Sequence, residues 1–126
     1  MSNPPKILVI DDHAGIRTLL SAFLGRTYEV TALSSGNEGL SYLYFGDGAP
    51  DLIVLDMDMP DVNGKEFLEQ LRFSGFFGNI PVVMVSGCED EAERRACTDL
   101  GAREVFNKPF NPTHLQDTIQ HLLTQN

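Results

Sequence analysis

The chain has 126 residues, of which 42% are hydrophobic and 21% are charged, which is typical of one globular domain and excludes a disordered chain. Its formal net charge of −9 makes nucleic acid a poor partner for this domain, because nucleic-acid binding depends on basic patches. No stretch is apolar and long enough for a membrane span, and the first residues lack the pattern of a signal peptide, so we expect a cytoplasmic location.

Strands and helices are predicted to alternate along the whole chain. Short apolar runs that stop at polar or turn residues indicate buried strands, and apolar residues at helical spacing indicate helices. In chain order, the predicted elements are a strand over 6–10, a helix through 16–24, a strand over 28–33, a helix over 35–45, a strand over 52–55, a helix around 67–71, a strand over 81–85, a helix over 89–100, a strand over 104–107 and a helix over 112–123.

Residues at the predicted helix starts support these boundaries. Ser35 fits an N-cap, and Glu38 fits the residue that reaches back to complete a capping box. Asn111 fits an N-cap followed by Pro112 at the first helical position. Acidic residues at the start of the fourth helix complement the positive end of its dipole.

The strict alternation predicts an α/β fold with a doubly wound, five-stranded parallel sheet and five helices, in a single domain over 1–126. Right-handed crossovers place helices on both faces of such a sheet, and ligands bind outside the carboxyl ends of its strands. Chemically useful side chains stand at those ends in this sequence: Asp11, Asp12, Asp56, Ser86 and Lys108.

This set of side chains indicates a metal-assisted phosphoryl site. Three neighbouring carboxylates repel one another, and a hard divalent cation such as Mg²⁺ relieves the repulsion. A carboxylate held at the cation can act as nucleophile toward an activated phosphoryl group. An ammonium group from Lys108 can neutralise the charge on the phosphoryl oxygens, and the Ser86 hydroxyl can hydrogen-bond them.

The same residues resemble a known family, the receiver domain of bacterial two-component response regulators. The resemblance extends from Lys6 to Leu123, and its motifs are specific when taken together in this order. The matching residues are Asp11 and Asp12, the run from Leu55 to Pro60 with Gly64, Ser86 and Gly87, and Gly101, Ala102 and Lys108 to Phe110. The resemblance implies a flavodoxin-like topology and a phosphorylation switch.

The resemblance also implies residue roles. Asp56 is then the phosphoacceptor, and Asp12 and Asp56 bind Mg²⁺ through their side chains, with Mn²⁺ able to substitute. Asp11 assists through a water molecule, and Asp58 assists through its backbone carbonyl. Further implied residues are Ser86 as the switch hydroxyl beside Gly87, Lys108 as the partner of Asp56 and of the phosphoryl group, and Pro109 after a cis peptide bond.

Partners follow from the resemblance as well. The phosphoryl donor is expected to be a phosphohistidine on a histidine kinase or phosphotransfer protein. The domain is not an enzyme toward other substrates, because it catalyses only its own phosphorylation and dephosphorylation. Its output is expected to act on an unknown downstream protein or through a homodimer, using the surface of the last helices, where Glu91, Arg94 and Arg95 are candidates for partner choice.

Other functions fit less of the sequence. A receiver-like module that binds partners without phosphate is one alternative. A phosphatase of the haloacid-dehalogenase type is another, since Asp56 and Asp58 form an aspartate-x-aspartate motif, although that motif normally follows an early strand and needs a larger domain. A flavin-binding protein is disfavoured because no phosphate-cradling loop follows the first strand.

Several residues invite a functional role that the sequence does not require. His13 follows the acidic pair as a possible ligand or proton donor, but its position varies in the family. His114 and His121 are expected at a surface or interface. Cys88 and Cys97 are expected to be free thiols, with Cys88 near a helix N-terminus. The cluster Phe73, Phe76 and Phe77 is expected to pack locally and, if exposed, to be a partner surface.

Two positions depart from the family pattern. The residue three before Lys108 is usually aromatic and is Val105 here, with Phe106 after it, so the usual coupling of an aromatic side chain to the switch hydroxyl is not expected in the same form. Gly87 stands where alanine is common and adds flexibility to its loop.

Asp58 yields a prediction about phosphoryl lifetime. Its carboxylate adds negative charge close to the phosphoryl group, so we expect Asp58→Asn to change the rate of autodephosphorylation. The decay of phosphorylated protein measures that rate, and an identical decay in the wild type and the variant would contradict the prediction.

Overall fold

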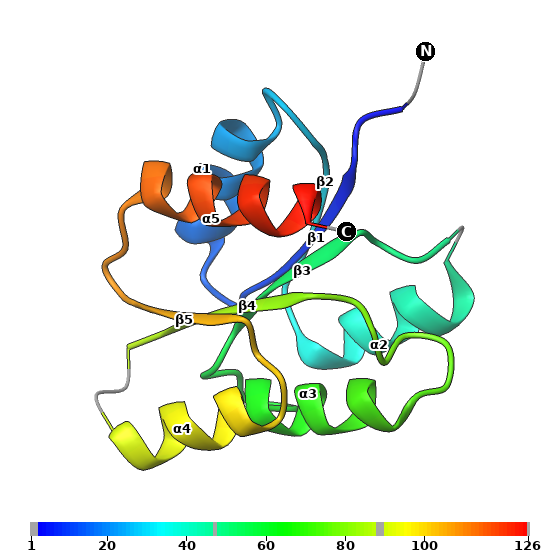
Figure 1. Cartoon of the computed structure of the whole chain (residues 1–126), viewed down its shortest axis with the longest axis vertical. Helices are drawn as coiled ribbons and strands as arrows, with labels where there is room; N and C mark the ends of the chain where they lie inside the picture. Colours follow the sequence, from blue (N-terminus) through cyan, green and yellow to red (C-terminus); the bar gives the residue numbers. More distant parts are fainter. Residues whose placement is uncertain (1–2, 47, 88–89, 126) are drawn as a thin grey trace.

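The computed structural model describes residues 3–46, 48–87 and 90–125, in which five strands alternate with five helices (Figure 1). The elements are β1 (Lys6–Ile10), α1 (Ala14–Leu24), β2 (Glu29–Leu33), α2 (Gly36–Phe45), β3 (Leu52–Asp56), α3 (Gly64–Phe73), β4 (Val82–Ser86), α4 (Glu91–Asp99), β5 (Glu104–Asn107) and α5 (Pro112–Thr124). The predicted elements are therefore confirmed, with boundaries that differ by a few residues.

The strands form one parallel sheet in the order β2-β1-β3-β4-β5. Figure 1 shows α1 and α5 on one face of this sheet and α2, α3 and α4 on the other. The chain thus winds in both directions from β1, which confirms the predicted doubly wound, flavodoxin-like fold. The reversal of strand order places β1 and β3 side by side at the centre of the sheet.

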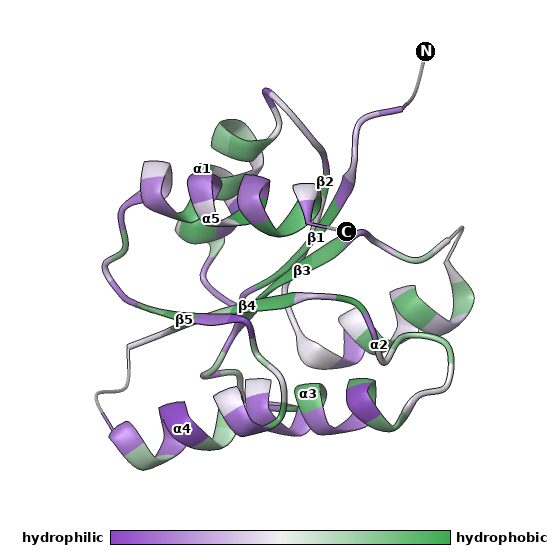
Figure 2. Ribbon diagram, in the orientation of Figure 1, coloured by the Kyte–Doolittle hydropathy of each residue, from purple (hydrophilic) through white to green (hydrophobic). Residues whose placement is uncertain are grey.

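Each face of the sheet carries its own apolar core. Strands β3 and β4 are buried along their whole length, as expected for central strands covered on both faces. Successive strand residues point to opposite faces, so Leu8 and Ile53 join the core under α2 and α3, whereas Val9 and Val54 join the core under α1 and α5. Figure 2 shows the apolar colouring concentrated on these inner surfaces.

Side-chain caps fix the helix starts. Ser35 Oγ accepts a hydrogen bond from the Glu38 amide at 3.1 Å, as predicted for an N-cap. The return bond of the expected capping box differs, because Glu38 Oε2 accepts from the amide of Ser34, at 2.9 Å, instead of from Ser35. Asp61 takes part too, since its carboxylate accepts from the amides of Gly36 and Asn37.

Arg72 binds three separate segments together at the end of the sheet remote from the aspartates. Its guanidinium donates to four backbone carbonyls, and the bonds measure 2.8 to 3.1 Å. The acceptors are the carbonyls of Gly78, Ile80, Leu100 and Gly101. Gly101 has φ +97°, a backbone conformation that favours glycine, and a Cβ there would lie 2.8 Å from Arg72 Nε and would displace the guanidinium.

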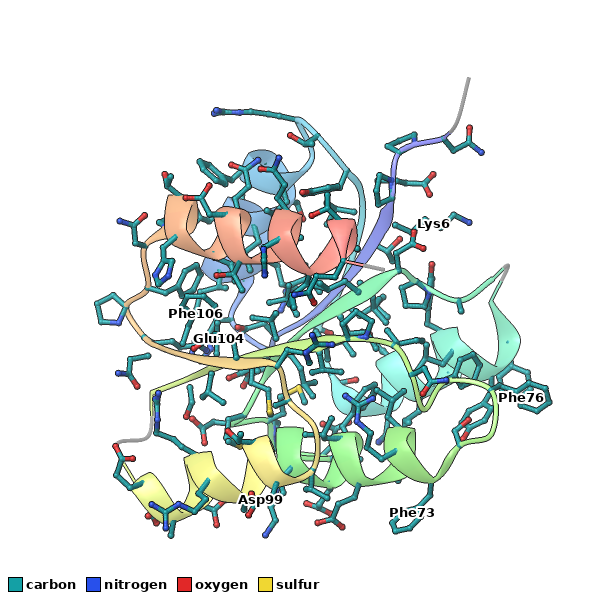
Figure 3. The ribbon with its side chains drawn as sticks, viewed as in Figure 1. Lys6, Phe73, Phe76, Asp99, Glu104 and Phe106 are labelled. Atoms are coloured by element: carbon teal, nitrogen blue, oxygen red, sulfur yellow. The ribbon has the colours of Figure 1, made fainter. Side chains whose placement is uncertain are left out.

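The predicted packing of the phenylalanine cluster is wrong for two of its three members. Phe73 is 88% exposed and Phe76 is 91% exposed, and Figure 3 shows both rings directed away from the body of the protein. Phe77 alone packs against the core, and it also meets the ring of Tyr44 edge-on, with 5.8 Å between centroids. Phe73 is the last residue of α3, and its side chain lies beyond the edge of the core.

No helix among the described residues combines the length and apolar character that a membrane crossing requires.

The role of Arg72 leads to a stability prediction. We expect Arg72→Met to lower the free energy of unfolding by about 2–4 kcal/mol, because four carbonyls lose a charged donor that a thioether cannot replace. Urea unfolding measures the change, and Arg95→Met, on the exposed side of α4, is the matched control. Equal effects of the two substitutions would show that the carbonyl contacts contribute no net stability.

Candidate functional site

Three strands deliver charged side chains to one edge of the sheet. Asp11 directly follows β1, Asp56 is the last residue of β3, and Lys108 directly follows β5. Lys108 Nζ lies 3.0 Å from Asp56 Oδ1 and 3.2 Å from Asp11 Oδ2. The lysine therefore links both carboxylates, although Asp56 is 52 residues and Asp11 is 97 residues away from it in sequence.

The two carboxylates are buried almost completely, since Asp11 is 1% and Asp56 is 0% exposed. Among the residues that the structure describes, one oxygen of each, Oδ2, has no hydrogen-bond partner. For Asp11 that oxygen is near the Lys108 ammonium without the geometry of a hydrogen bond. The Oδ2 atom of Asp56 has neither a hydrogen bond nor an ion pair with any described residue, so it is a buried anionic oxygen with unused acceptor capacity.

Burial dominates the ionisation of Asp56. It raises the pKa of this carboxyl from 3.8 to about 6, and the nearby charge of Asp11 acts in the same direction. The hydrogen bonds from Lys108 and from the Asp58 amide oppose the rise without cancelling it. Burial by itself lowers the pKa of Lys108, but the hydrogen bond to Asp56 and the charges of both aspartates outweigh it, so the lysine pKa is raised.

Asp12 and His13 complete a group of possible metal ligands. One ligand atom from each of Asp11, Asp12, His13 and Asp56 can be chosen so that all four lie within 4.8 Å of one another. Asp12 and His13 are exposed and the other two are buried, so the group reaches from the sheet edge to solvent. This donor set, together with the unpartnered Asp56 Oδ2, fits a divalent cation.

The loop after β3 is held close to Asp56. Asp58 donates its amide hydrogen to Asp56 Oδ1 at 3.2 Å. The amide of Gly64, at the start of α3, donates to the carbonyl of Met57 at 2.9 Å. A Cβ at Gly64 would lie only 2.5 Å from the Asp56 carbonyl oxygen, so only glycine allows α3 to begin this close to the end of β3.

An open depression lies beside the buried aspartates. Asp58 is exposed and lines it together with Asp12, and Glu93 from α4 contributes a further carboxylate. The remaining lining residues are Met57, Met59, Pro60 and Asn63. A ligand can therefore approach the end of β3 from solvent.

The other predicted residues stand at the ends of β4 and β5. Ser86 is the buried last residue of β4, in register with Asn107 of β5, and its carbonyl accepts from the Lys108 amide at 2.9 Å. Gly87 follows and is exposed. The Lys108–Pro109 peptide bond is cis.

Cys88 lies outside the described residues. Cys97 is a buried free thiol whose Sγ lies 3.6 Å from Met57 Sδ, and burial raises its pKa.

Val105 and Phe106 point to opposite faces of the sheet. Val105 joins the core under α2, α3 and α4. Phe106 joins the core under α5 and meets the ring of His114 edge-on. The aromatic side chain is therefore shifted to the other face by its one-residue displacement in the strand.

Two arginines near the site were not recognised as structural from the sequence. Arg17 of α1 donates to the carbonyl of Asp11 at 2.8 Å. Arg94 of α4 donates to the carbonyl of Val105 at 3.0 Å and to the side chain of Asn107. The sequence had suggested Arg94 only as a residue for partner choice, because nothing in its helical spacing indicates an acceptor on β5.

Comparison with known proteins gives the same family throughout. The family model of the response regulator receiver domain matches residues 7–120. The protein named "Probable transcriptional regulator ycf27" of Cyanophora paradoxa is 36% identical over 122 residues, which cover 96% of this chain and 49% of that protein. The chain spans about half the length of the first curated relatives that it matches.

Solved structures agree. The chemotaxis protein CheY4 of Vibrio cholerae has a TM-score of 0.85 and 29% identity, covering 94% of this chain and 98% of that chain. The phosphorylated cyanobacterial phytochrome response regulator RcpA has a TM-score of 0.81 and 26% identity, covering 94% of this chain and 91% of that chain. With a family model matched over nearly its whole length and an acidic pocket at the expected sheet edge, this chain belongs to the response regulator receiver domains of two-component signal transduction.

Proposed function

We propose that residues 1–126 form one receiver domain in which Asp56 accepts a phosphoryl group from a phosphohistidine of a histidine kinase or phosphotransfer protein, in the cytoplasm. The observation that carries the proposal is the unpartnered, fully buried Oδ2 of Asp56 at the end of a central strand. The phosphorylated state of the relative RcpA supports it.

The transfer follows from the position of this oxygen. Asp56 Oδ2 attacks phosphorus and forms the new P–O bond while the bond between phosphorus and the donor imidazole nitrogen breaks. The electron pair of the broken bond stays on that nitrogen. Lys108 Nζ, 3.0 Å from the other oxygen of Asp56, would neutralise charge on the transferred phosphoryl oxygens.

Asp12 and Asp56 would hold the cation through their side chains, with Asp11 acting through water and Asp58 through its backbone carbonyl. The oxygen-rich donors favour Mg²⁺, and Mn²⁺ takes similar ligands. When bound, the cation offsets the charge of the clustered carboxylates and of the phosphoryl oxygens. Without the cation, Asp11 and Asp56 share the single positive charge of Lys108 among the contacts described at their side chains. The His13 ring also lies near Asp11.

Phosphorylation would reach the surface through β4 and β5. Ser86 and Lys108 are joined by a backbone hydrogen bond, so a shift of the backbone at either residue would be passed to the other. Gly87 would let the following loop adjust. The surface of α4, β5 and α5 would then change its affinity for a downstream protein or for a second copy of the domain. The domain would act catalytically only on itself, through phosphoryl uptake and slow hydrolysis.

Phosphorylation tests this function directly. After incubation with acetyl phosphate and Mg²⁺, we expect the intact mass of the wild type to increase by one phosphoryl group and that of Asp56→Asn to stay unchanged. Asp117→Asn on the exposed surface of α5 is the control and should behave as the wild type. A folded wild type that binds Mg²⁺ but gains no mass would favour a phosphate-independent binding module instead.

The raised pKa of Asp56 predicts a pH-dependent stability. Folding the ionised carboxylate costs free energy above about pH 6, and the cost disappears below the ordinary value of 3.8, where folded and unfolded states both keep the proton. Without metal, Asp56→Asn should therefore be more stable than the wild type by about 1–3 kcal/mol near pH 8, with no difference near pH 4.

Urea unfolding in the presence of a chelator measures this difference across the pH range. Asp117→Asn should show no comparable trend, because that carboxylate is exposed. An Asp56→Asn variant that is less stable than the wild type at high pH would show that the contact with Lys108 outweighs the cost of burial.

A further inference from the structure

The ring of His13 faces the acidic group and not the helix that it caps. Its Nδ1 lies 3.1 Å from Asp11 Oδ1 and 3.1 Å from Asp12 Oδ1. The ring nitrogen therefore sits between two carboxylates of the site, and it belongs to the same group of possible ligand atoms as Asp56. The function proposed above makes no use of it.

Local backbone structure determines this position. His13 is the N-cap of α1 with φ −86° and ψ 113°, and its side chain makes no capping hydrogen bond. Its amide donates to Asp11 Oδ1 at 2.9 Å, and its carbonyl accepts from the Arg17 amide at 3.1 Å. The backbone is thus fixed on both sides of the residue, and the side chain leaves it toward Asp11 and Asp12.

The spacing suits ligands that share one ion. Neighbouring corners of an octahedron with bonds of about 2.1 Å are about 3.0 Å apart. The distance of 3.1 Å from His13 Nδ1 to Asp12 Oδ1, the oxygen of a carboxylate proposed above to bind the cation directly, is close to this value. Asp56 belongs to the same group of possible ligands, and its Oδ2 has no hydrogen-bond or ion-pair partner among the residues that the structure describes.

We propose that His13 is a nitrogen ligand of the cation in this site and shifts its preference from Mg²⁺ toward divalent transition ions such as Mn²⁺ and Co²⁺. The inference rests on the proposed cation site. Imidazole binds borderline transition ions more strongly than it binds Mg²⁺, which takes oxygen ligands almost exclusively. Without a nitrogen ligand, three carboxylates would distinguish these ions only by the general order of affinities of divalent metals.

Calorimetric titration with Mg²⁺ and with Co²⁺ at neutral pH tests the preference. His13→Asn should lose about tenfold or more in Co²⁺ affinity and much less in Mg²⁺ affinity. Asparagine is a good N-cap, so α1 keeps its start in the variant. His121→Asn is the matched control, because that ring lies on α5 and contacts Gln125.

Pulsed electron paramagnetic resonance of bound Mn²⁺ provides a second readout. Coupling to a histidine nitrogen should be present in the wild type and in His121→Asn and absent in His13→Asn. An unchanged ratio of Co²⁺ to Mg²⁺ affinity in His13→Asn, or missing nitrogen coupling in the wild type, overturns the inference. A rise in affinity for every ion in His13→Asn also overturns it, since the ring then competes with the cation.

Failure of the proposed cation site would give a different experimental result from failure of the His13 inference. A wild type that binds neither Mg²⁺ nor Co²⁺ overturns the cation site itself, and the inference with it. Mg²⁺ binding that Asp12→Asn abolishes, together with an unchanged metal preference in His13→Asn, overturns the inference alone.

Discussion

The arrangement of this domain depends on an excess of buried negative charge at one sheet edge. Asp11 and Asp56 are both removed from water, and Lys108 is the ammonium that reaches them. Burying a charge without full compensation costs free energy, and the apolar cores on both faces of the sheet offset that cost. The surrounding fold thus keeps these charges close together at the sheet edge.

The surroundings of the aspartates show how these positions are held. Gly64 lets α3 start against the carbonyl of Asp56, and Asp61 connects the same loop to the start of α2. The loop that carries Asp58 is therefore fastened at both of its ends. Lys108 follows a strand whose partner, β4, ends in the buried Ser86. Both strand ends are thus set by backbone pairing and not by the ion pair alone.

Much of this could be predicted from the sequence because the signals are local. Apolar runs that end in Asp11, Asp56 and Ser86 identify strands, and the parallel topology then brings their ends together without further information. The N-caps at Ser35 and Asn111 are equally local, and the structure contains both.

The contacts that escaped prediction join residues through space. Arg72 reads as a surface charge at the end of a helix, and its four carbonyl acceptors come from loops whose conformation no pattern specifies. Arg94 and Asn107 likewise meet only because α4 packs beside β5. The exposure of Phe73 and Phe76 was not predicted because apolar side chains are expected to pack in a core. The core does not extend as far as these two residues.

The contacts of Arg72 have a consequence for motion. They secure the carbonyls of Leu100 and Gly101, which directly follow the last turn of α4, whereas the first turn of that helix begins a few residues after Gly87. These contacts hold the C-terminal end of α4, whereas the switch proposed above would act near its N-terminal end. Under the proposed function, any displacement of α4 on phosphorylation would therefore be smallest beside Leu100 and Gly101.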